Sequence, residues 1–428
     1  MISRRQFVAS LPIAASCLGT AVSGGGATGA AEVPEPGRRK RIAFLGTSVY
    51  QHSHAQHFLD RFAAGYAIGG RWVEPQVDVA SVFIDQVPEN DIGRQRIAKY
   101  KLRQVPSVAE ALTLGGSQLA VDGVVIIAEH GEYPDNDRGQ RLYPRYAWFK
   151  ECVKVFEASG RSVPVFNDKH LSTNWDECVE MVADSERLGF PFYAGSSLPV
   201  TWRLPAVEMP YDTPLSESVC VAYGGVDSYD VHALETAQCM SERRAGGEVG
   251  IRSVHAVRGA ACWAMLRDRE VTRKLFLSAL MRSHNLPVET GYPSAPVDMP
   301  WAEANLPDTI AYFVEHLDGF RTTIFLTNIR DFNYAGMRSD TGEIIGCQFM
   351  LPMPGRGATT ADFFTPLVQH VEKMFVTGAT TYPIRRTLLA SGMVIGGVES
   401  LFAGQTPYAT PRMAIAYRGP RESAFWQE

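Results

Sequence analysis

The sequence predicts two folded domains: an α/β domain with a parallel sheet, then an α+β domain with a large, mostly antiparallel, open-faced sheet. Between residues 40 and 198, short apolar runs alternate with helical patterns, and such strand–helix–strand crossovers belong to parallel sheets. Between residues 199 and 428, longer strand-like runs come with hairpin signals such as Asp318-Gly319, which favour antiparallel pairing. A chain of 428 residues is also long for one hydrophobic core.

The clearest crossover begins with an apolar run at Val163–Phe166, which predicts a buried strand. The polar residues Asp168-Lys169-His170 end this strand, and Thr173–Asp176 has the pattern of a helical capping box. The helix should stop at Gly189, and a second strand follows at Phe190–Ala194. A lysine just past a parallel strand lies at the edge where open α/β sheets bind ligands. Lys169 is therefore a candidate site residue.

The chain enters the first domain through a strand at Arg41–Leu45, a turn at Gly46-Thr47-Ser48, and a helix capped by Ser53. This helix should carry Ala55, Phe58, Leu59, Phe62 and Tyr66 on one apolar face. A helix N-terminus after a glycine turn is a seat for the pyrophosphate of a dinucleotide, which would place Gly46, Thr47, Ser48 and His54 around a cofactor.

Two further strand ends contribute to the same edge. Asp85 follows a strand at Val77–Ile84, and an acid there would bind the adenosine ribose diol, which favours NAD over NADP. Glu129 and His130 follow a strongly apolar strand at Val121–Ala128 and open a long polar loop, and a helix at Tyr143–Ala158 leads on to the lysine strand. Acids and a histidine beside Lys169 suit a polyhydroxylated ligand, because each hydroxyl needs a donor and an acceptor.

In the second domain, a strand at Val219–Tyr223 runs into Gly224-Gly225, and His232 begins a helix. Glu235 lies about one helical turn later and would orient the His232 imidazole. Further strands are expected at Arg252–Val257, Thr309–His316, Thr322–Asn328 and Ile344–Leu351, and helices at Phe363–Phe375 and Thr387–Phe402.

These stretches together resemble the glucose–fructose oxidoreductase/inositol dehydrogenase family (Gfo/Idh/MocA) over nearly all of Lys40–Pro420. Gly46 and His54 match the ends of the family pattern Gly-x-Gly-x-x-Gly-x-x-His, with Ser48 and Gln51 in place of two glycines. Asp168-Lys169-His170 stands where the family has Glu-Lys-Pro, and the lysine matches. The Gly224–His232 segment resembles the second signature, Gly-Gly-x-x-x-Asp-x-Gly-x-His, with Ser228 at the aspartate position.

The resemblance implies a Rossmann-type domain that binds NAD or NADP and a sheet domain that binds a sugar or polyol. It implies that His232 is the general base and that the Lys169 ammonium donates to the reacting oxygen. It also implies a homo-oligomer formed through the second sheet. The remaining candidate residues are Gly46, Thr47, Ser48, His54, Asp85, Glu129 and His130 for the cofactor, and Arg203, Asp227, Ser228 and Glu235 for the substrate.

The N-terminus predicts export. Ser3-Arg4-Arg5-Gln6-Phe7 and the apolar stretch after it are typical of a twin-arginine signal peptide over residues 1–31, with a linker at 32–39. We therefore expect a periplasmic protein; a lipid anchor at Cys17 is an alternative. No stretch is long enough to span a membrane, and a net charge of −5 gives no footprint for nucleic acid.

Two other functions remain open. The missing loop glycines are compatible with a non-catalytic periplasmic carbohydrate-binding protein of the same fold. His52, His54 and His57 could instead bind a metal in a hydrolase or lyase, with acids from Glu129–Asp137. His54 and His57 lie in a first helical turn, whose N–H groups disfavour a cation, so we expect no metal.

Overall fold

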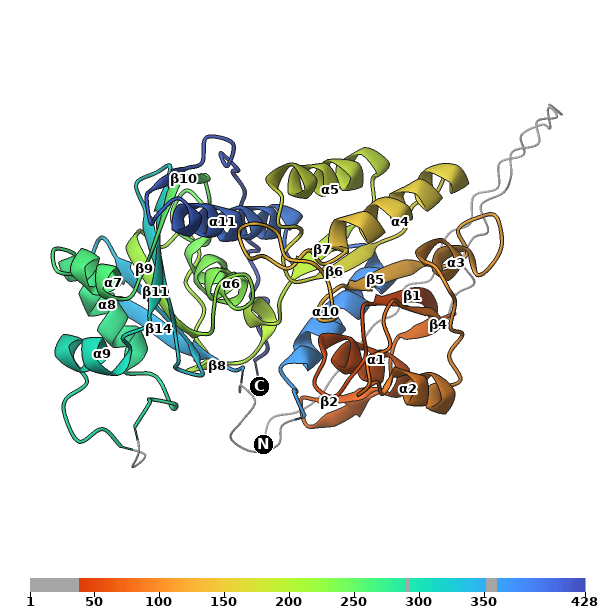
Figure 1. Ribbon diagram of the computed structural model, residues 1–428, viewed down its shortest axis with the longest axis horizontal. Helices are drawn as coiled ribbons and strands as arrows, with labels where there is room; N and C mark the ends of the chain where they lie inside the picture. The colour runs from red at the N-terminus through yellow and green to blue at the C-terminus, as the bar shows by residue number, and fades with distance from the viewer. Residues whose placement is uncertain (1–37, 289–291, 352–359, 428) are drawn as a thin grey trace, which may run out of the picture. The chain divides into compact units, whose positions relative to one another are not determined.

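The computed structural model describes residues 38–288, 292–351 and 360–427 (Figure 1). Residues 39–428 form one compact unit. The predicted signal peptide and most of the linker lie outside the described residues. Among those residues, no helix is both long and apolar enough to cross a membrane.

The first sheet has five parallel strands in the described chain, in the order β4-β1-β5-β6-β7. The chain starts at β1, adds β4 on one side, and then continues through β5 on the other, so the topological switch lies between β1 and β5. The strands are β1 Lys40–Gly46, β4 Val77–Ile84, β5 Gly123–Ile127, β6 Val165–Asp168 and β7 Phe192–Gly195. The predicted parallel sheet is confirmed.

Helices cover both faces of this sheet (Figure 1). One apolar cluster joins α3, α4 and α5 to the sheet, and another joins α1 and the distant α10 to its other face. The helices are α1 His54–Ala64, α2 Gly93–Tyr100, α3 Val108–Thr113, α4 Arg145–Ser159, α5 Trp175–Leu188 and α10 Phe364–Thr377. Strands buried on both faces read as continuous apolar runs, which is why β5 was the easiest strand to predict.

The second sheet contains eight strands within the described ranges, in the order β15-β10-β11-β12-β9-β13-β14-β8. The β12–β9 pair is parallel and the other neighbours are antiparallel, as predicted. The strands are β8 Arg203–Leu204, β9 Leu215–Tyr223, β10 Ile251–Arg258, β11 Ile310–His316, β12 Arg321–Thr327, β13 Phe332–Arg338, β14 Ile344–Phe349 and β15 Tyr408–Ala409.

Helices α6 and α11 lie on the face of this sheet that turns toward the first sheet, and α7, α8 and α9 pack on its other face. Helix α11 contacts α5 and β7 on one side and α6 and β10 on the other, so it joins the two halves (Figure 1). The helices are α6 Asp230–Ser241, α7 Ala260–Leu266, α8 Glu270–Leu280, α9 Met299–Asn305 and α11 Ile384–Phe402.

Two local expectations are wrong. Helix α5 is capped by Asn174, whose side chain accepts from the N–H of Asp176 at 2.8 Å, and not by Thr173. Helix α1 ends at Ala64, so Tyr66 belongs to a short hairpin of β2 Tyr66–Ile68 and β3 Arg71–Val73. The predicted cap of α1 is confirmed, because the Ser53 hydroxyl accepts from the N–H of Gln56 at 3.1 Å.

Candidate functional site

A small cavity lies beyond the carboxyl ends of β6 and β7, where they meet the first turn of α1 and the start of α6. Its volume is about 120 Å³. We call it the histidine cavity. Five imidazoles line it together with Asp168, Ser196, Ser197 and Tyr229, and the apolar part of its wall comes from Leu351, Ala361, Phe363 and Phe364. The imidazoles are those of His52, His54, His57, His130 and His232.

His54 and Asp168 form a close pair in this wall. Nδ1 of His54 lies 2.6 Å from Oδ2 of Asp168. Asp168 is the last residue of β6 and is 1% exposed, and its second oxygen, Oδ1, has no partner within the described chain. The His54 ring packs edge-on against Phe364, with 4.9 Å between the ring centroids. The contacts with Asp168 and Phe364 therefore hold this imidazole in one orientation.

The other buried imidazoles of the cavity are neutral at pH 7. Burial, followed by the nearby Arg61 and histidines, lowers the pKa of His57 to about 3. Burial, with His54 next, lowers the pKa of His130 to about 4, and burial together with Lys169 holds the pKa of His232 well below its ordinary value. Nε2 of His130 and Nδ1 of His232 are buried without a hydrogen-bond partner in the described residues.

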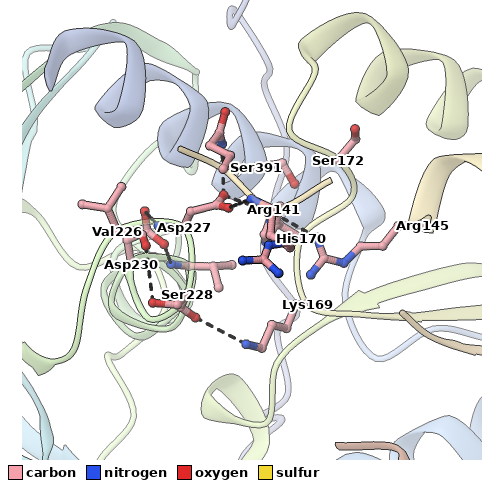
Figure 2. Close-up of polar contacts among 12 residues, drawn as sticks. Arg141, Arg145, Lys169, His170, Ser172, Val226, Asp227, Ser228, Asp230 and Ser391 are labelled. Carbon is pink, nitrogen blue, oxygen red and sulfur yellow. Dashed lines mark hydrogen bonds and ion pairs between the residues drawn. The ribbon is translucent and has the colours of Figure 1, made fainter. Parts of the chain in front are cut away.

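Lys169 lies beside the cavity wall but does not line it. Its ammonium lies 2.7 Å from Oε1 of Glu129 and 3.4 Å from the carbonyl of Ser228, toward which it points in Figure 2. The guanidinium of Arg145 donates to the other oxygen of Glu129 at 2.6 Å, and its Nη1 lies 3.2 Å from His170. Burial alone raises the pKa of Glu129, but Lys169 and Arg145 together hold it well below its ordinary value.

The residues predicted to bind substrate are distributed around this centre. The carboxylate of Asp227 accepts from the Gln140 side chain at 3.0 Å. It also accepts from the Arg141 N–H at 3.1 Å (Figure 2). The hydroxyl of Ser228 donates within its own turn to the carbonyl of Gly225. The hydrogen bonds of Asp227 join the loop after β5 to the segment that leads into α6.

The prediction that Glu235 orients the His232 imidazole is wrong. Oε2 of Glu235 accepts from the backbone N–H of Ser196 at 2.8 Å, and burial raises its pKa to about 7. Arg203 does not line the histidine cavity; it stacks on Phe349 and Phe425, and its charge is paired with Glu208 at 2.6 Å. These contacts make Arg203 part of the packing of the second sheet.

The residues of the predicted dinucleotide seat contact one another and the loop after β5. Thr47 bridges the crevice between β1 and β5, because its N–H donates to Ile127 and its hydroxyl donates to the carbonyl of Glu129 at 2.6 Å. His130 packs against both Tyr50 and His54, each at 5.4 Å between ring centroids, over the N-terminus of α1. Thr47 and Ser48 are fully buried.

The ribose position is engaged as well. The Tyr133 hydroxyl donates to Oδ2 of Asp85 at 2.6 Å, and Gln86 exchanges hydrogen bonds with the backbone of Glu132. Asp85 and Gln86 also pair through their backbones with Gly46 and Thr47. These contacts hold the loop after β5 against the residues predicted to bind the cofactor.

The described residues contain no group of three or more His, Cys, Asp or Glu side chains arranged to hold a metal ion. The structure therefore lends no support to the metal site considered for His52, His54 and His57. The sequence marks Asp168 only as the end of a strand. It carries no signal for Phe364, which reaches the cavity from 310 residues beyond His54 along the chain.

No protein-family model matches the sequence, and no curated protein matches it. Solved structures do match its fold. GenD2 from gentamicin A biosynthesis, in complex with NAD, is 11% identical, with a TM-score of 0.53, over 88% of this chain and 99% of that one. A putative myo-inositol dehydrogenase from Sinorhizobium meliloti is also 11% identical, with a TM-score of 0.53, over 88% of this chain and 100% of that one.

A myo-inositol dehydrogenase from Lactobacillus casei, in complex with NAD(H) and myo-inositol, is 9% identical, with a TM-score of 0.53, over 87% of this chain and 97% of that one. At these identities the likeness concerns the fold. The two-sheet architecture that the resemblance implied is thereby confirmed along nearly the whole described chain.

Proposed function

We propose that this protein binds a sugar or polyol in the histidine cavity. The observation that carries the proposal is the set of buried polar atoms in the cavity-lining residues that lack a partner among the described residues: Asp168 Oδ1, His130 Nε2 and His232 Nδ1. Buried polar groups in folded proteins are nearly always hydrogen-bonded, so each such atom calls for an explanation. A ligand with several hydroxyls, each both donor and acceptor, satisfies both the carboxylate and the imidazoles.

The size and charge of the cavity favour a small neutral ligand. A volume of about 120 Å³ lies below the roughly 300–1,000 Å³ typical of drug-sized ligands, so we expect about one ring. The lining imidazoles with lowered pKa values carry no charge at pH 7 that would select an anion. Myo-inositol in the complex of the Lactobacillus casei enzyme is a molecule of this class.

A second candidate is NAD(P)-dependent oxidation of the same ligand, in an enzyme of the Gfo/Idh/MocA type. It is favoured by the match of this fold to 99% of GenD2, which was solved with NAD, and to 97% of the Lactobacillus casei myo-inositol dehydrogenase, which was solved with NAD(H). This function requires space for a dinucleotide beside His130 and Tyr133, which contact His54 and Asp85. Lys169 and His232 would then have the roles that the resemblance implies for them.

Calorimetry on the full chain separates these candidates. We expect heat of binding with myo-inositol or D-glucose and none with NAD(H) or NADP(H). Replacing His232 by phenylalanine should weaken polyol binding roughly tenfold, because the loss of one hydrogen bond costs about 1.4 kcal/mol. The control Lys274→Gln, on the exposed surface of α8, should leave polyol binding unchanged. Nucleotide released on denaturation, or polyol-dependent reduction of NAD(P), would select the oxidoreductase. No heat with any sugar or polyol would contradict the binding function.

We also propose that the protein is exported by the twin-arginine pathway to the periplasm. The proposal is supported by the Arg4-Arg5 pair and the apolar stretch after it. In cell fractionation, changing Arg4 and Arg5 together to lysine should move the protein from the periplasm to the cytoplasm. An unchanged periplasmic fraction would rule out this route.

A further inference from the structure

We propose that His54 and Asp168 form an acid–base pair in which Nε2 of His54 accepts a proton from a hydroxyl of the bound molecule. The inference rests on the proposed function, because it requires a sugar or polyol in the histidine cavity. It assigns to His54 a chemical role, in place of the cofactor contact predicted from the sequence. Asp168 is the positioning residue of the pair.

The tautomer of His54 follows from its contact with Asp168. A carboxylate accepts only, so Nδ1, at 2.6 Å from Oδ2, must carry the hydrogen that is shared between them. In the neutral ring this leaves Nε2 unprotonated, and the residue lines the cavity. Within the described chain, no protein atom hydrogen-bonds Nε2. The nitrogen is therefore available to accept from a ligand.

The pair is held by elements that cannot easily move. Asp168 ends β6 and is 1% exposed. The next residue, Lys169, pairs through its backbone with Gly195 at the end of β7. His54 is the first residue of α1, whose capping hydroxyl from Ser53 is itself fully buried. A base oriented by a buried carboxylate is the arrangement by which proteins activate hydroxyl groups.

The other basic groups near the cavity lack this arrangement. Nδ1 of His232 has no partner in the described residues, and the two nearest carboxylates along its helix, those of Asp230 and Glu235, accept from Tyr312 and Ser196. The Lys169 ammonium is paired with Glu129 and does not line the cavity. No carboxylate within the described ranges hydrogen-bonds the ring of His57 or His130. His54 is thus the imidazole best placed to accept a proton.

The step is a proton transfer. The O–H bond of a ligand hydroxyl breaks, its electron pair stays on the oxygen, and the proton bonds to Nε2. The imidazolium that forms keeps its Nδ1–H on Asp168, whose negative charge stabilises it. The reverse step returns the proton to the oxygen. Such a pair would serve a reaction in which negative charge develops on a ligand oxygen.

Nitrogen NMR of the full chain, labelled with ¹⁵N-histidine, tests the pair. His54 is identified by the signal that disappears in His54→Gln. We expect its Nε2 to show the shift of an unprotonated nitrogen at neutral pH, and Asp168→Asn to change that shift. Adding myo-inositol or D-glucose should move the Nε2 signal as the nitrogen accepts a hydrogen bond. His255→Gln, on β10 outside the cavity, is the matched control and should leave these responses intact.

In the NMR experiment, two results would overturn the inference alone: a protonated Nε2 in the free protein, or calorimetric binding of a polyol that leaves the Nε2 shift unchanged. The absence of calorimetric binding with any sugar or polyol would instead overturn the proposed function, and the proton-acceptor role with it. If the wild type converts a polyol, His54→Gln should lower kcat roughly 10²–10⁴-fold, with a much smaller change in KM. An unchanged kcat would contradict the assignment.

Discussion

Replacing Glu129 by alanine is expected to lower the free energy of unfolding by about 3–5 kcal/mol. Among the described residues, Glu129 is the only carboxylate that accepts from the Lys169 ammonium, and the substitution removes it. It also leaves the Arg145 guanidinium buried without this partner. Lys169 is 5% exposed and Arg145 is 3% exposed, so water cannot replace the lost partner. Leaving two cations buried without a counter-charge costs far more than losing a surface ion pair.

Urea unfolding of the two proteins measures this loss, and Glu180→Ala is the matched control. Glu180 also pairs with a lysine, Lys150, at 2.6 Å, but its own side chain is 48% exposed. Exposed pairs contribute about 0–1 kcal/mol. Equal losses in the two variants would show that the buried pair is no more valuable than the surface pair. If Glu129→Ala does not fold, the double variant Glu129→Gln with Lys169→Met should restore folding, because it removes the uncompensated ammonium.

The same carboxylate predicts a pH dependence. Burial would raise the pKa of Glu129, but Lys169 and Arg145 hold it well below the ordinary 4.5. A carboxyl with a depressed pKa contributes stability that is fully present above its unfolded pKa and is lost as the pH falls through the folded value. The difference in unfolding free energy between wild type and variant should therefore be flat from about pH 5 to 8 and shrink only in more acid solution. A difference that shrinks toward neutral pH would contradict this assignment.

The elements that the sequence predicted well are those whose pattern is local. The strand at β5 is a continuous apolar run, and the N-cap of α1 needs only Ser53 and Gln56, three residues apart. Where two neighbours can both cap a helix, the pattern does not choose between them. Thr173 and Asn174 were such neighbours, and the backbone of α5 selected Asn174.

The site could be predicted only in part, because its chemistry depends on partners far away in the chain. The end of a strand placed Lys169 near the ligand edge, but the carboxylate that engages its charge lies 40 residues earlier. Asp168 precedes Lys169 directly, and the imidazole it orients lies 114 residues away. Strand and helix patterns locate an edge, whereas the ion pairs that form across it follow from packing that one sequence does not reveal.

Substituting Gly195 by alanine is expected to lower the free energy of unfolding by about 2–5 kcal/mol, from backbone strain and overpacking together. Gly195 ends β7 with a φ of +133°, a backbone conformation that residues other than glycine rarely adopt. A Cβ there would lie 2.5 Å from both Oε1 of Glu235 and the Tyr382 hydroxyl. Both neighbours are fully or nearly fully buried, so neither can move aside easily.

Gly189→Ala separates the two contributions, because Gly189 also has a positive φ of +68°, but a Cβ added there would meet no atom within 4 Å. It should lose only about 1–2 kcal/mol, the cost of the backbone conformation. A loss at Gly195 no larger than at Gly189 would show that Glu235 can give way. If Glu235 cannot move aside, the strain reaches Ser196, because Oε2 of Glu235 accepts from the N–H of Ser196. Ser196 lines the histidine cavity, so calorimetric binding of the polyol should weaken in the Gly195 variant and not in the Gly189 variant.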